Sequence, residues 1–244
     1  MHVNVWGSAG PEALLVHGSG AGGELMWRRQ RPLAEGRRLL VVDRPGHGGT
    51  PARARVDFDD EADLLEDVLP DGAHLVGHSY GAVVSLTLAT RHPERVRSVV
   101  VSEPPIYGIA ADDPAARRLM EDAADLWDDT GLDPHTWFDR LADLIDERKY
   151  PGGLPPAAVR GVELLRGERR PWTARPELER LADARVPVLV LSSGSVAGME
   201  ATCDAVAART GGHRELVPGS GHSVPREAER YNSLVADFWD SVEA

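Results

Sequence analysis

The stretch Gly77-His78-Ser79-Tyr80-Gly81 decides the fold of this chain. It follows the short run 74–76 and precedes an apolar, helix-forming run over residues 82–89. A strand, a tight turn and a helix are therefore expected in direct succession, with Ser79 at the turn. In such a Gly-x-Ser-x-Gly turn, the glycines avoid collisions with the neighbouring elements and the serine hydroxyl is exposed. The pattern predicts that Ser79 is a nucleophile rather than an ordinary turn residue.

Apolar strand-like runs alternate with helical patterns on both sides of this stretch. Strands are expected at 2–6, 13–17, 38–43, 73–77, 96–102, 186–192 and 213–217, and helices at 24–35, 59–69, 80–91, 198–209 and 225–241. This alternation predicts an α/β fold with a mostly parallel sheet and helices on both of its faces.

The alternation is interrupted once, between residues 103 and 186. This stretch contains no strand-like run, but it repeats the spacing of amphipathic helices and is broken by proline and glycine. We therefore expect a core formed by residues 1–103 and 186–244, with a helical insertion over residues 104–185. Three tryptophans stand at apolar positions of the insertion and predict an apolar wall: Trp127, Trp137 and Trp172.

Four segments together resemble the α/β-hydrolase superfamily, in its order and approximate spacing. They are His17-Gly18, Asp43-Arg44-Pro45-Gly46-His47-Gly48, the turn at 77–81 and Gly221-His222. The resemblance covers nearly the whole chain and implies the α/β-hydrolase fold. It also implies that residues 104–185 form a lid over the active site, with an ordinary helical decoration of the core as the alternative. His17, Trp127 and Trp137 are then the candidates for lining the pocket.

A serine hydroxyl is a poor nucleophile at neutral pH and needs a base within hydrogen-bond reach. His222 is the candidate base, because it follows the last expected strand, where the superfamily places its histidine. The resemblance also implies an oxyanion hole formed by the backbone N–H groups of Tyr80 and Ser19. Gly20 replaces Ser19 if the loop register differs by one residue.

The position of the acid departs from the superfamily's usual pattern. Most members carry an aspartate after the strand that precedes the last one, but here no carboxylate occurs between that strand and Glu200. A minority carry the acid after the strand that leads into the lid, and Glu103 stands at that position. We predict that Glu103 orients His222. The alternatives are a structural carboxylate at the entry to the lid, and a triad that lacks an acid or takes one from elsewhere.

Composition limits the partners and the location of the protein. The chain of 244 residues has a net charge of −12, which argues against nucleic acid and anionic membranes as partners. It has one cysteine, no run of 18 apolar residues and no secretory signal at residues 1–20, so a cytoplasmic location is expected. No Cys/His cluster has metal-ligand spacing, and we expect no metal, no cofactor, and a monomer or homodimer with a small-molecule substrate.

These observations favour a serine hydrolase that cleaves an ester, lactone or thioester of a small, partly apolar molecule through an acyl-enzyme. One alternative is a lyase or cyclase in small-molecule biosynthesis that uses Ser79 and His222 for proton transfer only. Another is a ligand-binding pseudo-enzyme, which the missing aspartate motivates and the Gly-rich loop after His17 opposes.

Overall fold

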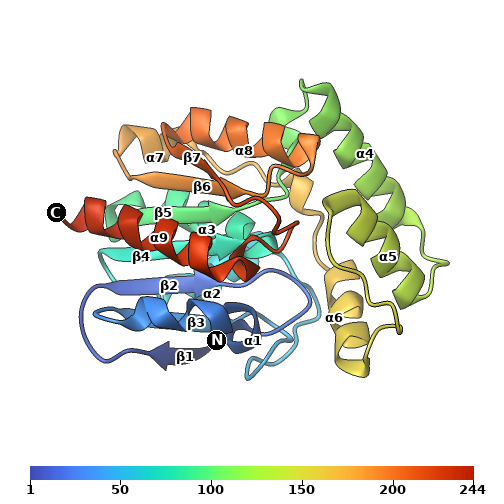
Figure 1. Cartoon of the computed structure of the whole chain (residues 1–244), viewed down its shortest axis with the longest axis horizontal. Coiled ribbons are helices and arrows are strands. Elements are labelled where there is room, and N and C mark those ends of the chain that lie inside the picture. Colours follow the sequence, from blue (N-terminus) through green and yellow to red (C-terminus); the bar gives the residue numbers. More distant parts are fainter.

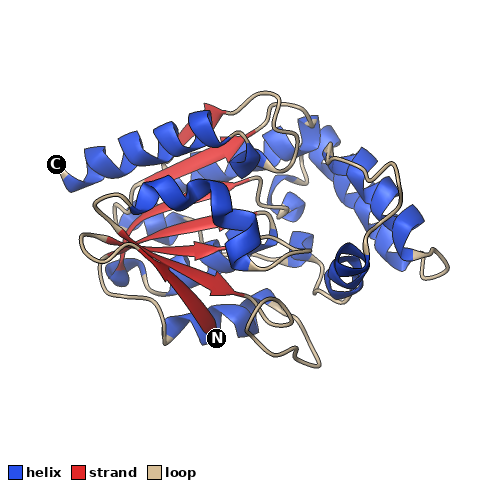
Figure 2. Ribbon diagram, turned by 60° about the horizontal axis from the view of Figure 1, so that its bottom comes forward, coloured by secondary structure: helices blue, strands red, loops and turns tan.

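The computed structural model describes all 244 residues, built around one seven-stranded sheet (Figures 1 and 2). The strands are β1 (His2–Trp6), β2 (Glu12–Val16), β3 (Arg38–Asp43), β4 (Ala73–His78), β5 (Val96–Ser102), β6 (Val188–Ser192) and β7 (His213–Leu216). Their order across the sheet is β1-β3-β2-β4-β5-β6-β7. Only β1 pairs antiparallel, with β3, and all other pairs are parallel. The predicted mostly parallel α/β fold is confirmed.

The chain has nine α-helices. They are α1 (Gly23–Trp27), α2 (Phe58–Glu66), α3 (Tyr80–Arg91), α4 (Pro114–Asp128), α5 (Pro134–Ile145), α6 (Pro156–Arg166), α7 (Glu179–Asp183), α8 (Ala197–Thr210) and α9 (Ala228–Glu243). One apolar core lies between the sheet and α2, α3 and α8, and a smaller one lies between the opposite face and α1 and α9. No helix is both long and apolar enough to cross a membrane.

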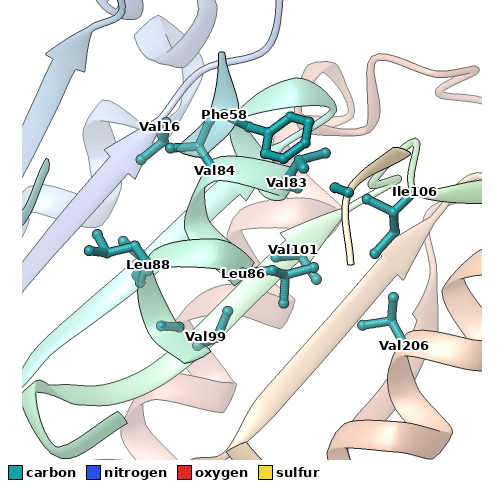
Figure 3. Close-up of a cluster of buried hydrophobic side chains, with 14 of the residues drawn as sticks. Val16, Phe58, Val83, Val84, Leu86, Leu88, Val99, Val101, Ile106 and Val206 are labelled. Atoms are coloured by element: carbon teal, nitrogen blue, oxygen red, sulfur yellow. The ribbon is translucent and has the colours of Figure 1, made fainter. Parts of the chain in front are cut away.

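Burial on both faces explains why the strands have continuous apolar sequences. In β5, Val99 and Val101 face the larger core while Val100 faces the smaller one, because successive side chains of a strand point to opposite faces. Figure 3 shows Val99 and Val101 beside Leu86 of α3 and Val206 of α8 within the larger core.

Three expected helices are shorter than their sequence patterns indicated, and the one expected at 59–69 ends at Glu66. The expected helix at 24–35 ends at Trp27 and continues as a 3-10 turn over Arg28–Ala34, which contains Pro32. The expected helix at 225–241 begins at Ala228, after a 3-10 turn that contains Pro225. Proline lacks a backbone N–H and clashes with the preceding turn, so regular α-helix does not extend through either position.

The inserted segment, residues 104–185, contains α4 to α7. Aspartate side chains cap α4 and α5: Asp113 and Asp133 each accept two backbone N–H bonds, and proline occupies the next position. Figure 1 shows α4, α5 and α6 grouped to one side of the sheet, whereas α7 lies with α8. Three helices of the segment thus form a separate layer, and the fourth belongs with the helices that flank the sheet.

Candidate active site

Ser79 lies in the tight turn between β4 and α3, with φ 53° and ψ −125°, a backbone conformation that is unfavourable for a non-glycine residue. The two flanking glycines allow this turn to form. A Cβ on Gly77 would lie 2.6 Å from the Cα of Ala82, and one on Gly81 would lie 2.3 Å from the carbonyl oxygen of Val16. The strand, turn and helix expected from the sequence are therefore present, with the Ser79 side chain half-buried at the edge where the parallel strands end.

Ser79, His222 and Glu103 form one hydrogen-bonded chain. The distance from Ser79 Oγ to His222 Nε2 is 2.9 Å, and the distance from His222 Nδ1 to Glu103 Oε2 is 2.7 Å. A carboxylate can only accept, so Nδ1–H donates to Glu103 and Nε2 is left to accept from the Ser79 hydroxyl. The structure thus brings the three predicted catalytic residues into the arrangement that an activated serine requires.

Glu103 is fixed by two elements. It has a positive φ of 44°, directly after β5, and its backbone N–H donates to the carbonyl oxygen of Leu191 in β6 at 3.0 Å. Its Oε1 accepts from the backbone N–H of Ser193 at 2.8 Å and from the Ser193 hydroxyl at 2.7 Å. One carboxylate oxygen is therefore held by the turn after β6, and the other is directed at His222.

Sequence reasoning missed Ser193, which follows β6 directly, in the turn where most α/β-hydrolases carry the acid. The feature that could have pointed to Ser193 is the serine-rich run at 192–195, which stands where a carboxylate was expected. Glu200, the first carboxylate after β6, bonds to Ser192 and Arg214. Neither of its carboxylate oxygens bonds to His222.

The end of α5 holds the loop that carries His222. The backbone N–H of His222 donates to the carbonyl oxygen of Asp146 at 3.0 Å, and Asp146 has a left-handed backbone with φ 54°. From the other side, Nε2–H of His78 donates to the His222 carbonyl oxygen at 2.9 Å. The His78 side chain therefore supports the histidine loop and does not contact the Ser79 hydroxyl.

The two predicted oxyanion donors lie close to the nucleophile and are free. A Cβ on Gly18 would lie 3.1 Å from the Cβ of Ser79, so the loop after β2 runs alongside the serine. Neither the Ser19 N–H nor the Tyr80 N–H donates a hydrogen bond within the protein. The N–H of Gly20 is also free, and the assignment of Ser19 rather than Gly20 stays a prediction.

His17 has a structural environment. Its Nε2 accepts from the backbone N–H of Arg44 at 2.9 Å, and its Nδ1–H donates to the Gly18 carbonyl oxygen at 2.6 Å. Burial, together with the nearby Arg44 charge, lowers the pKa of His17 well below its usual value, so the ring is neutral. His17 lines a surface groove that includes Arg28 and Arg226, and it does not line the cavity described next.

A narrow cavity of about 50 Å³ opens from Ser79 toward the inserted segment. Its walls are mostly apolar and include Leu119, Trp127, Leu141, Ile145 and Trp172. A second cavity, of about 140 Å³, also includes Ser79 and His222 but extends toward α6. Ser79 and His222 therefore line both cavities.

Two predicted pocket residues, His17 and Trp137, line neither of these cavities. Trp127 lines the narrow cavity, as expected, but Trp137 lines neither cavity and is fully buried. The indole N–H of Trp137 donates to the Leu126 carbonyl oxygen at 3.0 Å, and its ring packs edge-on against Trp127, with centroids 4.7 Å apart. Trp137 thus joins α4 to α5 behind the cavity wall. No group of three His, Cys, Asp or Glu side chains is arranged to hold a metal ion.

Comparison with known sequences assigns the family. The sequence model of the alpha/beta hydrolase family matches residues 13–234. The chain belongs to the alpha/beta hydrolase family. A pimeloyl-acyl-carrier-protein methyl ester esterase from Chromobacterium violaceum is 39% identical over 92 residues, which cover 38% of this chain and 36% of that protein. A 2-hydroxymuconate semialdehyde hydrolase from Pseudomonas sp. strain CF600 is 40% identical over 102 residues, 38% of this chain and 36% of that protein. The chain thus matches little more than a third of the length of these two relatives.

Solved structures share the fold over nearly the full length. NosK from Streptomyces actuosus superposes with a TM-score of 0.66 at 26% identity, covering 97% of this chain and 100% of NosK. Rv0554 from Mycobacterium tuberculosis superposes with a TM-score of 0.75 at 24% identity, covering 100% of this chain and 94% of that chain. The resemblance seen in the four sequence segments is therefore confirmed at the level of family and fold.

Proposed function

We propose that this protein is a serine hydrolase that cleaves an ester, lactone or thioester of a small, partly apolar molecule through an acyl-enzyme intermediate. The observation that carries this proposal is the continuous hydrogen-bonded chain from Ser79 Oγ through His222 to Glu103. A serine in a strained turn, an imidazole nitrogen 2.9 Å from its hydroxyl and a buried carboxylate behind that imidazole are what nucleophilic catalysis by serine needs.

In the proposed reaction, Ser79 Oγ attacks the substrate carbonyl carbon while His222 Nε2 takes the hydroxyl proton. The Glu103 carboxylate stabilises the imidazolium that forms. The carbonyl oxygen becomes an oxyanion and accepts from the backbone N–H groups of Tyr80 and Ser19. His222 then passes its proton to the leaving alcohol or thiol, and an acyl-Ser79 ester remains. Water, deprotonated by His222, attacks this ester and releases the acid and Ser79.

The cavity walls support the proposed substrate class. The narrow cavity is small and apolar, which suits a short acyl or aryl group, while the larger cavity toward α6 leaves room for the other part of the substrate. The two named relatives are an esterase and a hydrolase by name, in agreement with this chemistry. We also propose that the protein acts in the cytoplasm, as a monomer or homodimer, without nucleic acid or membrane partners.

Active-site labelling tests the proposal. A fluorophosphonate probe should react with the wild-type protein, and Ser79→Ala should abolish the reaction. Ser220→Ala is the matched control, because the Ser220 hydroxyl bonds only to backbone carbonyl oxygens outside the triad. Undiminished labelling of Ser79→Ala would contradict the proposal. Labelling at Ser79 without turnover of any ester, lactone or thioester would favour the lyase or the pseudo-enzyme instead.

A further inference from the structure

Glu168, which follows α6 in the inserted segment, is a buried carboxyl group that the proposed reaction does not use. Its Oε2 accepts from the Ser19 hydroxyl at 2.5 Å, and its Oε1 accepts from Arg44 Nη2 at 2.8 Å. It also lines the narrow cavity together with Ser79. The sequence did not single out this residue, yet it contacts the side chain of a predicted oxyanion donor.

The position of Glu168 is fixed from both of its sides. Arg44 is fully buried and donates to Glu168 at 2.8 Å, so this ion pair holds the Glu168 carboxylate from one side. The backbone at Glu168 is bridged to Val56, and the next residue, Arg169, donates its N–H to the Val56 carbonyl oxygen at 2.8 Å. Ser19 is therefore hydrogen-bonded to a group with little freedom.

The same segment touches the oxyanion loop, residues 17–23, at a second point. A Cβ on Gly161 of α6 would lie 2.3 Å from the carbonyl oxygen of Gly20, so the helix backbone rests directly on the loop. The loop contains four glycines, at 18, 20, 22 and 23, and such a sequence loses much conformational entropy when it is ordered. The loop therefore needs contacts from outside itself to hold one conformation.

The environment of Glu168 disfavours its charged form, so the residue is not explained by a contribution to stability. Burial raises the pKa of Glu168 to about 7, against the opposing effects of Arg44 and Ser19, and Glu61 shares the same guanidinium. Two carboxylates paired with one buried arginine are a weak source of stability. The contact that Glu168 adds to this network is the one to Ser19.

We propose that Glu168 is a positioning residue of the oxyanion hole. By holding the Ser19 hydroxyl, it fixes the direction of the Ser19 backbone N–H toward the oxyanion that forms above Ser79. A serine side chain has one heavy-atom torsion, so a fixed Oγ leaves its backbone little freedom. This inference rests on the proposed function, and it assigns part of the catalytic geometry to the inserted segment.

The test compares Glu168→Met with Glu61→Met, measured by ester turnover on purified, folded proteins. Both variants remove a carboxylate from Arg44, but only the first removes the acceptor of Ser19. Glu168→Met should lower kcat about 30-fold or more, with KM within about 3-fold, because misdirecting one oxyanion donor costs up to ~10²-fold. Glu61→Met should lower kcat less than about 3-fold. Glu168→Gln, which keeps a hydrogen bond to Ser19, should recover most of the rate.

Two further measurements keep the test independent of folding. Ser19→Ala retains the backbone N–H but loses the tether, so it should lower kcat by a factor similar to Glu168→Met, and the double variant should be no worse than either. A trifluoromethyl ketone forms an oxyanion on Ser79. It should bind the wild type and Glu61→Met, which keep the bond from Ser19 to Glu168, more tightly than Glu168→Met or Ser19→Ala, by the same factor as the change in kcat. The product acid should bind all four proteins equally.

Equal kcat for Glu168→Met and Glu61→Met, a wild-type kcat for Ser19→Ala, or a loss confined to KM would each overturn the inference. A failure of the proposed function would look different. The wild-type protein would then not turn over esters, and Ser79→Ala would still be labelled by the fluorophosphonate.

Discussion

The sheet edge and the inserted segment contribute to the same site in different ways. Ser79 and Glu103 directly follow adjacent parallel strands, β4 and β5, and the register of those strands brings the two residues to one edge. The inserted segment reaches that edge through Trp127 at the cavity and through hydrogen bonds, because Asp146 accepts from the His222 N–H and Glu168 accepts from Ser19. The sheet edge therefore holds the groups proposed for bond making and breaking, and the segment holds groups that shape the cavity and fix the loops.

The largest effect is expected at the sheet edge. Ser79→Ala should lower kcat/KM by about 10⁴-fold or more, because loss of the nucleophile leaves only binding and oxyanion contributions. The variant should be as stable as the wild type or more so, since alanine fits the turn. Steady-state hydrolysis of a short-chain aryl ester measures the effect. More than about a tenth of the wild-type activity would exclude the acyl-enzyme.

The inserted segment should affect substrate binding instead. Trp127→Ala enlarges the narrow cavity, so KM for esters with apolar acyl groups should rise about 10-fold while kcat changes little. Trp137→Ala is the matched comparison, since it removes a neighbouring ring that does not reach the cavity. It should cost about 3 to 5 kcal/mol of stability with a smaller change in KM. If both variants changed KM equally, the cavity wall would be assigned wrongly.

A smaller effect is expected at the turn after β6. Ser193→Ala removes the hydroxyl donor to Glu103 Oε1 but keeps the backbone N–H that donates to the same oxygen. Losing one of two hydrogen bonds to a carboxylate that still contacts His222 should lower kcat about 3- to 10-fold. Steady-state kinetics with the same aryl ester measures it. A loss as large as that of Ser79→Ala would mean that Ser193 takes part in the chemistry.

A further prediction concerns stability in acid and not catalysis. Burial, and next the Arg44 charge, lowers the pKa of His47 to about 4, so this ring stays neutral when folded and takes a proton when unfolded. Such a group contributes stability above pH ~6.5 that is lost as the pH falls toward 4. Between pH 7.5 and 5, urea unfolding should show the wild type losing about 2 kcal/mol relative to His47→Gln. His135→Gln, at an exposed position of α5, is the matched control.

The sequence was sufficient for the residues proposed to carry the chemistry. Ser79 and His222 stand in short motifs, and Glu103 follows the apolar run 99–101, at the position where the resemblance implies that a minority of the superfamily carries the acid. Ser193 could not be placed, because its bond to Glu103 depends on how the turn after β6 is formed.

The contacts of the inserted segment could not be predicted from the sequence, for a different reason. The bond from Ser19 to Glu168 joins residues 149 positions apart, and it depends on how the inserted segment packs on the oxyanion loop. Helical periodicity placed Trp137 on an apolar face of its helix, but it did not show that this face packs against α4 instead of lining the cavity. Leu141 of the same helix reaches the cavity, whereas Trp137 faces Leu126 of α4.

The central claim is that Glu103, which follows β5, serves as the acid of the site, and kcat/KM of Glu103→Gln tests it most directly. Glutamine keeps the shape and can still accept from Ser193, but it removes the charge that stabilises protonated His222. We predict a loss of about 10³- to 10⁴-fold with an unchanged unfolding transition, close to what an acid-to-amide change costs in a protease triad. A kcat/KM within a few fold of the wild type in a folded variant would contradict the claim and make Glu103 a structural carboxylate.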